Sequence, residues 1–210
     1  FYFKNLNSIG KNVDTYKSSP QIEIQSLLEF KSELPLAKLS KNSYQTLIPK
    51  MSLRVNPSDM KDHSSDKRRI NTNNIFNINR LGISDSLESG NSLTVGVDYK
   101  TQKDKNTDDN YFEFKMASVF RDEEKNNIPS QTTLNKKNSN IFGSIDYRTS
   151  KFITLDYDFA FDNKFENLNY NSIGLDFSIN NFITEFNFIE ENSLSENTNV
   201  FESIIEYKFN

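Results

Sequence analysis

Residues 153–161 read ITLDYDFAF, and apolar side chains alternate with polar or small ones along them. Leu155 and Tyr157 fall on one parity, whereas Asp156 and Asp158 fall on the other. Because a strand points successive side chains to opposite faces, this segment predicts a strand with one apolar face and one carboxylate-bearing face.

The same alternation recurs along most of the chain, in segments close to the ~10 residues with which a strand crosses an outer membrane. The sequence therefore predicts an all-β fold, an antiparallel transmembrane β-barrel segment of about nine to ten strands that is part of a larger barrel. The expected strands span residues 22–36, 44–55, 93–100, 112–121, 141–147, 153–161, 172–179, 182–188 and 201–209.

The connections between these segments favour a barrel. The polar stretches 56–91 and 122–139 are long, whereas the links at Thr149-Ser150 and Asn180-Asn181 are tight. Barrels of the outer membrane have short periplasmic turns and longer extracellular loops, and Asn tolerates the positive φ of a tight hairpin. We therefore expect both tight links to be periplasmic turns and 56–91 to be a long extracellular loop.

Tyrosines gather at one end of the expected strands, as in an interfacial aromatic girdle. Tyr44 and Tyr111 have the parity of the polar face, so this girdle is imperfect. The five tyrosines at the expected periplasmic end are Tyr44, Tyr99, Tyr111, Tyr147 and Tyr207.

The composition agrees with a barrel rather than a helical membrane protein. Hydrophobic residues make up 35% of the 210 residues, and the mean hydropathy is −0.70. No stretch approaches the ~20 consecutive apolar residues of a membrane-spanning helix. The 18 Phe and 9 Tyr argue against disorder, and the net charge of −4 argues against a nucleic-acid binder. A soluble two-sheet protein with a solvated outer face is the structural alternative.

The chain begins at Phe1 rather than at Met and ends at Asn210 inside a strand-like run, so we expect a piece of a longer protein. Residues 1–19 are expected to be an irregular start or the end of a preceding strand. Residues 20–210 are expected to be the central part of the barrel.

No residue pattern predicts catalysis, a cofactor or a metal, so we expect no enzyme activity. The single His63 lies in the longest polar loop, without a Cys or a second His to complete a metal site. Asp108-Asp109 and Asp122-Glu123-Glu124 lie in connections, where solvated turn charges are the simpler interpretation than paired catalytic carboxylates.

Two groups of charges are candidates for ligand contact, although the sequence leaves ligand-binding residues undetermined. Lys67-Arg68-Arg69 could contact phosphates outside the cell, since guanidinium groups match phosphate oxygens, but a solvated run of loop charges is the favoured interpretation. The carboxylates of the polar parity either wet the interior or line a hydrophilic path. They are Asp98, Asp146, Asp156, Asp158, Asp176, Glu185 and Glu202.

Several short segments, in order along the chain, resemble one family. They are Leu34-Pro35-Leu36, residues 44–50 (YQTLIPK), residues 74–81 (NIFNINRL), residues 88–96 (ESGNSLTVG) and Phe120-Arg121-Asp122. Together they resemble the C-terminal β-barrel part of the outer-membrane LPS-assembly protein family, LptD, over most of residues 20–210.

This resemblance implies transport of lipopolysaccharide (LPS) and its delivery to the outer leaflet of the cell outer membrane of a Gram-negative bacterium. It also implies a barrel that holds a plug lipoprotein (LptE-like) and receives LPS from periplasmic bridge components. The family's periplasmic domain and its disulfide-forming cysteines are not in this segment, which has no Cys. Its lateral gate lies between the first and last strands, which we expect this segment to lack. The alternatives are another outer-membrane barrel (a porin or specific channel), a barrel enzyme, or a soluble β-rich binding module.

Overall fold

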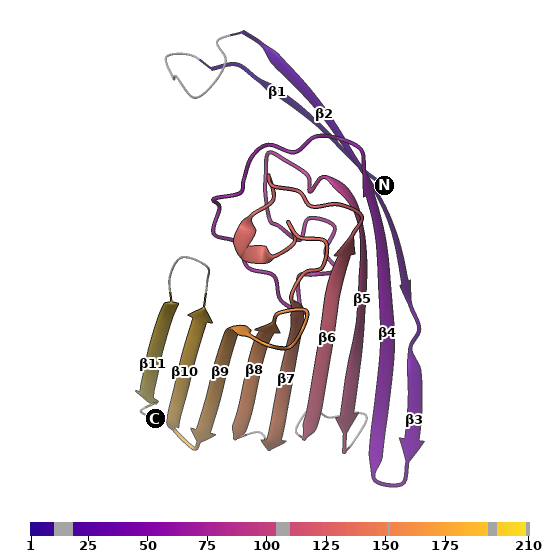
Figure 1. The fold of residues 1–210 in the computed structure, drawn as a ribbon. Helices are drawn as coiled ribbons and strands as arrows, with labels where there is room; N and C mark the ends of the chain where they lie inside the picture. Colours follow the sequence, from indigo (N-terminus) through magenta and orange to yellow (C-terminus); the bar gives the residue numbers. More distant parts are fainter. Residues whose placement is uncertain (11–18, 104–109, 151, 193–196, 209–210) are drawn as a thin grey trace.

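A single antiparallel sheet forms the computed structural model of this chain (Figure 1). The structure describes residues 1–10, 19–103, 110–150, 152–192 and 197–208. Its eleven strands are β1 (Tyr2–Ser8), β2 (Gln21–Glu33), β3 (Leu36–Ser40), β4 (Ser43–Asn56), β5 (Gly90–Gln102), β6 (Tyr111–Arg121), β7 (Ile141–Ser150), β8 (Ile153–Phe161), β9 (Leu168–Ile179), β10 (Phe182–Asn192) and β11 (Asn197–Tyr207).

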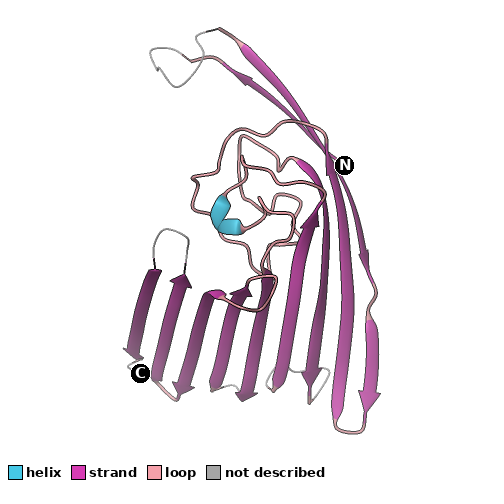
Figure 2. Cartoon of the chain, in the orientation of Figure 1, coloured by secondary structure: helices cyan, strands magenta, loops and turns pink. Residues whose placement is uncertain are grey.

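Strands that are neighbours in sequence are neighbours in the sheet, except that β4 pairs with both β2 and β3. The predicted antiparallel all-β fold is confirmed, but the sheet is open, with β1 and β11 at its edges. Apart from a 3-10 turn, η1 (Ser130–Thr132), the rest of the described chain is loops and turns (Figure 2). Among the described residues, no helix has the length and apolar character needed to cross a membrane.

β2 and β3 are two parts of one strand position. Glu33 pairs with Lys50 and Leu36 pairs with Leu47, so the register continues across Leu34-Pro35. Pairing lapses there because proline has no N–H to donate. The sequence predicted that this strand ends near Leu36. In the structure, pairing with β4 instead continues from Leu36 to Ser40, before the two-residue turn at Lys41-Asn42.

Long and tight connections occur at opposite ends of the sheet, as the sequence predicted. The tight turns lie at one end of the sheet, and the long connections, residues 57–89 and 122–140, lie at the other (Figure 1). The Asn180-Asn181 turn is confirmed, and Asn180 has a φ of 53°. The turn predicted at Thr149-Ser150 is wrong, because both residues belong to β7 and Ser150 still pairs with Ile153.

The two faces of the sheet differ as the alternation predicted. We call the face on which the long connections pack the inner face, and the opposite one the outer face. Large apolar side chains of the outer face are exposed, among them Ile24, Phe30, Leu53, Ile173 and Ile205. The buried apolar core lies on the inner face, between the sheet and the long connections.

Candidate functional site

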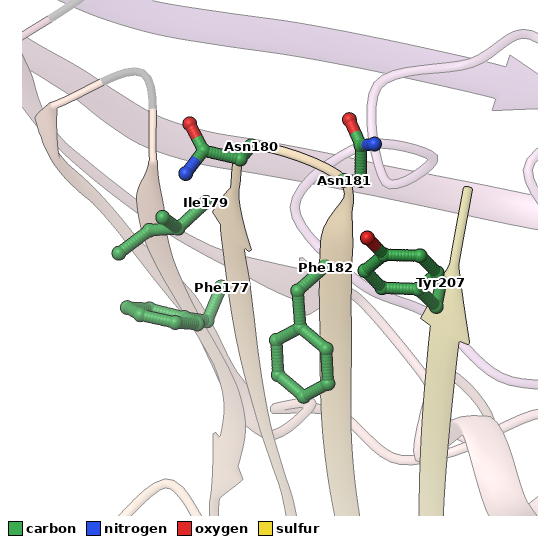
Figure 3. A pocket seen from close by; sticks show the side chains of 6 residues that line it. All are labelled: Phe177, Ile179, Asn180, Asn181, Phe182 and Tyr207. Carbon is green, nitrogen blue, oxygen red and sulfur yellow. The ribbon is translucent and has the colours of Figure 1, made fainter. Parts of the chain in front are cut away.

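The outer face ends in an apolar and aromatic belt at the tight turns. Figure 3 shows Phe177 and Ile179 of β9 beside Phe182 of β10, below the two Asn side chains of the turn. Tyr207 of β11 pairs with Phe182 and completes this corner. The predicted tyrosine positions all lie at this end of the strands, with Tyr99, Tyr147 and Tyr207 on the outer face. Such a belt suits the boundary between lipid and water.

The inner face near the tight turns is charged. Lys50 lies 2.5 Å from Asp98, and Lys115 lies 3.1 Å from Glu113, as Nζ-to-carboxylate distances. From β7 to β11 acidic side chains dominate: Asp146 and Asp156 are paired across neighbouring strands. Charges of this density are compatible with water or a polar partner, and not with lipid.

The half of the inner face near the long connections is covered by those connections. Residues 57–89 contribute Met60, Ile70, Ile75, Leu81 and Ile83 to the core, and residues 122–140 contribute Ile128 and Leu134. The sheet contributes Ala117, Val119, Phe142 and Ala160. We call these two connections, packed on the inner face, the plug. Each of its large apolar side chains contributes roughly 1.5–3 kcal/mol by burial.

One contact shows how closely the plug approaches the sheet. A Cβ built on Gly96 of β5 would lie 2.9 Å from the Phe76 ring and 2.9 Å from the Met116 carbonyl oxygen. Phe76 therefore rests on bare backbone, and its ring also lies 5.8 Å from the Lys50 Nζ. Glycine is required here because any larger residue would push the plug away.

A buried ionic cluster joins the plug to the wall. The Arg80 Nε and Nη2 donate to the two Glu88 carboxylate oxygens at 2.7 and 2.5 Å. Arg121 of β6 donates to the same carboxylate at 2.5 Å, and Arg54 of β4 lies 3.5 Å from it. These four side chains are at most 4% exposed.

Other donors of the cluster tie further parts of the plug to the strands, whereas the buried Arg121 Nε has no hydrogen-bond partner among the described residues. Arg54 donates to the Ile78 carbonyl at 2.6 Å, and Arg80 donates to Thr94 Oγ1 of β5 at 2.9 Å. Arg121 also donates to the Ser89 carbonyl. The cluster therefore fixes both the middle and the end of the 57–89 connection.

The charge of Glu88 is the centre of this arrangement. Burial would raise the pKa of the Glu88 carboxyl, but the Arg80, Arg54 and Arg121 guanidinium groups and the hydrogen bonds from Arg80 hold that pKa well below its usual range. Glu88 is thus ionised at neutral pH and offsets part of the positive charge around it. The sequence pattern around Glu88 indicated a family resemblance and did not predict this buried ionic role.

The basic run of the plug is exposed, as predicted, and one of its residues also contacts the sheet. Lys67 and Arg68 are exposed, as expected of a solvated loop. Arg69 instead donates to Glu191 of β10 at 2.7 Å, and its guanidinium carbon lies 4.2 Å from the Tyr170 ring centre. Arg69 nevertheless remains exposed, with 42% of its side chain accessible, so the run is solvated as predicted and Arg69 also ties the plug to β9 and β10.

His63 is more enclosed than a surface loop residue. Its side chain is 15% exposed, with Nδ1 3.1 Å from Asp66 and Nε2 3.3 Å from Asp85. Both carboxylates belong to the plug, so His63 organises the connection. No group of three or more His, Cys, Asp or Glu side chains able to hold a metal occurs in the described part of the chain.

The acidic pairs of the connections have separate outcomes. Asp122, Glu123 and Glu124 are exposed, and Asp122 accepts a hydrogen bond from Asn91 at 2.8 Å. Asp108-Asp109 lies outside the described residues.

A comparison with models of protein families shows to which family the chain belongs. Residues 4–208 match the model of the family described as LptD, LPS transport system D. The chain belongs to the LptD family. Proteins of the LptD family act in LPS transport and assembly in the outer membrane of Gram-negative bacteria, where they interact with LPS and other Lpt components. A comparison with curated proteins found no match.

Proposed function

We propose that this chain forms the central part of an LptD barrel that delivers LPS to the outer leaflet as a barrel-plus-plug-lipoprotein translocon. The observation that carries the proposal is the two-sided sheet within a chain that matches the LptD family over residues 4–208. Its outer face suits lipid, and its inner face suits the sugars of LPS.

The open sheet is proposed to be completed by further strands. An unpaired backbone group costs several kcal/mol in hydrocarbon, so the edges at β1 and β11 need partners within a membrane. Closure into a larger barrel supplies those partners.

The proposed mechanism separates the two halves of LPS. The sugar portion passes along the polar inner face while the acyl chains remain in lipid, since each buried CH₂ is worth about 0.8 kcal/mol. The chain has a passive role in this scheme, with no catalytic step. The long connections face the cell exterior, and the tight turns face the periplasm.

The proposed partners are LPS, an LptE-like plug lipoprotein and the periplasmic bridge components. The charged part of the inner face between the tight turns and the plug is left uncovered by residues 57–89 and 122–140, so a polar partner can occupy it.

Depletion of the full-length protein in its host tests the proposal. We expect newly made LPS to accumulate before the outer leaflet, measured by its accessibility to a surface-restricted probe, and an LptE-like lipoprotein to co-purify. Unchanged LPS at the surface, together with lost uptake of small solutes, would instead indicate a porin.

A further inference from the structure

The buried ionic cluster between the plug and the sheet carries more positive than negative charge. Arg54, Arg80 and Arg121 surround the carboxylate of Glu88, and these four side chains are at most 4% exposed. Guanidinium groups keep their proton in proteins. Three positive charges and one negative charge therefore leave a net charge of +2 among side chains that are removed from solvent.

Other charged residues around the cluster do not remove this excess. Glu29 of β2 lies across from the β4 arginine in the sheet, but its carboxylate is also 3.6 Å from the Lys31 Nζ, so this pair adds no net charge. Lys125 and Glu123 form a second such pair, with the Nζ 2.5 Å from the carboxylate. Asp122 is exposed, so water screens its charge.

Two buried hydrogen-bond donors at the edge of this cluster have no partner among the residues that the structure describes. They are the Arg121 Nε–H and the Ser89 hydroxyl. The two residues are in contact, because Arg121 also donates to the Ser89 carbonyl. A Cβ built on Gly90 would lie 3.1 Å from the Arg121 Nη2, so the guanidinium group lies against the Ser89-Gly90 backbone. Buried polar groups are nearly always hydrogen-bonded, and two such donors on neighbouring residues indicate an acceptor supplied by a bound group.

The chemistry of the cluster selects the class of that bound group. A guanidinium group donates hydrogen bonds and accepts none, and a net positive charge repels a cation. A water molecule can accept from both donors, but it leaves the excess of charge unchanged. A small anion accepts hydrogen bonds and also offsets one positive charge, which is favourable because an uncompensated charge is costly to bury.

We propose that a monovalent inorganic anion of about the size of chloride binds beside Arg121 and accepts hydrogen bonds from the Arg121 Nε–H and the Ser89 hydroxyl. Ser89 ends the 57–89 connection and Arg121 ends β6, so the anion fastens the plug to the sheet. This site goes beyond the proposed function, because it concerns the attachment of the plug and does not depend on what the barrel transports.

The test measures the opening of the plug in the full-length protein, purified in detergent, at neutral pH and constant ionic strength. Sodium gluconate is replaced by sodium chloride, and hydrogen exchange of peptides from residues 57–89 is followed by mass spectrometry. An anion that binds only the closed plug lowers its opening by the factor 1 + [L]/Kd, so exchange should slow at least tenfold in chloride. Sodium sulfate at equal ionic strength should slow it less than twofold, because the enclosed site excludes a larger divalent anion.

A substitution of Ser89 distinguishes a contact to the anion from an unused hydroxyl. Ser89→Ala removes one proposed contact and no charge, so the slowing of exchange by chloride should fall below threefold. Thr184→Val is the matched control, because it also removes a buried hydroxyl without a partner among the described residues, but on β10 rather than in the plug. This control should keep the tenfold response of the parent.

Bromide locates the anion directly. Crystals of the full-length protein grown in sodium bromide should give an anomalous difference peak at hydrogen-bond distance from the Arg121 Nε. Equal exchange in chloride and gluconate, equal slowing by sulfate, an unchanged chloride response in the Ser89→Ala variant, or no bromide peak beside Arg121 would each overturn the proposal.

Discussion

Replacing Glu88 by Gln removes the one carboxylate among three buried guanidinium groups. Arg80 contacts both carboxylate oxygens at 2.7 and 2.5 Å, and Arg121 contacts one at 2.5 Å. The substituted amide keeps one acceptor oxygen and turns an NH₂ group toward N–H donors. Breaking a buried ion pair from one side costs about 3–5 kcal/mol, because the remaining charges stay buried without compensation.

We expect the substitution to weaken the packing of the plug on the sheet rather than the sheet itself, since the strand ladders do not include Glu88. At ~1.4 kcal/mol per factor of ten, a 3–5 kcal/mol loss corresponds to a rise of roughly two to nearly four orders of magnitude in the opening of the plug. Hydrogen exchange followed by mass spectrometry, on peptides from residues 57–89 and from β8, measures this directly. The exchange of β8 should change little.

The pH dependence follows from the lowered pKa of Glu88. Its ionised form stabilises the plug fully above the ordinary pKa of 4.5, and this contribution is lost as the pH falls from there toward the lower pKa of the folded state. Plug protection in the parent should therefore be flat from about pH 6 to 8. Glu124→Gln, at an exposed position in the other long connection, is the matched control. Equal protection of residues 57–89 in the Glu88→Gln variant and the parent would refute the role given to the cluster.

Three further predictions concern the sheet. Leu155→Arg on the outer face should destabilise the membrane-inserted protein by about 2–4 kcal/mol, measured by urea unfolding in lipid vesicles. The control Ser172→Arg on the inner face should be tolerated. Equal destabilisation by the two substitutions would contradict the assignment of faces. Gly96→Ala should cost roughly 1–3 kcal/mol and increase exchange around Phe76, because its Cβ has no room, so an unchanged exchange pattern would count against the close contact. Asn180→Val should slow refolding and destabilise the hairpin by on the order of 1–2 kcal/mol, because a β-branched residue resists a φ of 53°. Asn180→Gly should not destabilise the hairpin. A Val variant as stable as the parent would argue against this turn geometry.

Alternation predicted the strands well because each strand of this sheet has two different environments. The period of two is visible wherever both faces are consistent, as between Ile153 and Phe161. It did not predict that pairing would resume after Pro35, because the sequence shows the lost donor but not the continued register. The sequence predicted a turn at Thr149-Ser150 because both residues are as polar as a turn, although they belong to β7 and Ser150 still pairs with Ile153.

The plug could not be derived from periodicity. Its apolar side chains, such as Ile70, Ile75 and Ile83, are spaced irregularly, since each contacts the core from a loop. The run around residues 74–81 was the available signal, because aromatic and aliphatic residues are unusual in a purely solvated loop. In the Glu88 cluster, Arg121 and Arg54 are separated from Glu88 by 33 and 34 positions of sequence, respectively. Only the folded arrangement of β4, β6 and the plug brings these side chains together.

Site-directed labelling in lipid vesicles measures most directly whether the two faces of the sheet meet lipid and water. Spin labels at Leu155, Phe177 and Ile205 should be quenched by oxygen dissolved in the acyl region, whereas labels at Asp156 and Asp176 should be quenched by a water-soluble nickel chelate. Labels on both faces that respond only to the aqueous quencher would contradict the proposed barrel wall, and with it the proposed path for LPS.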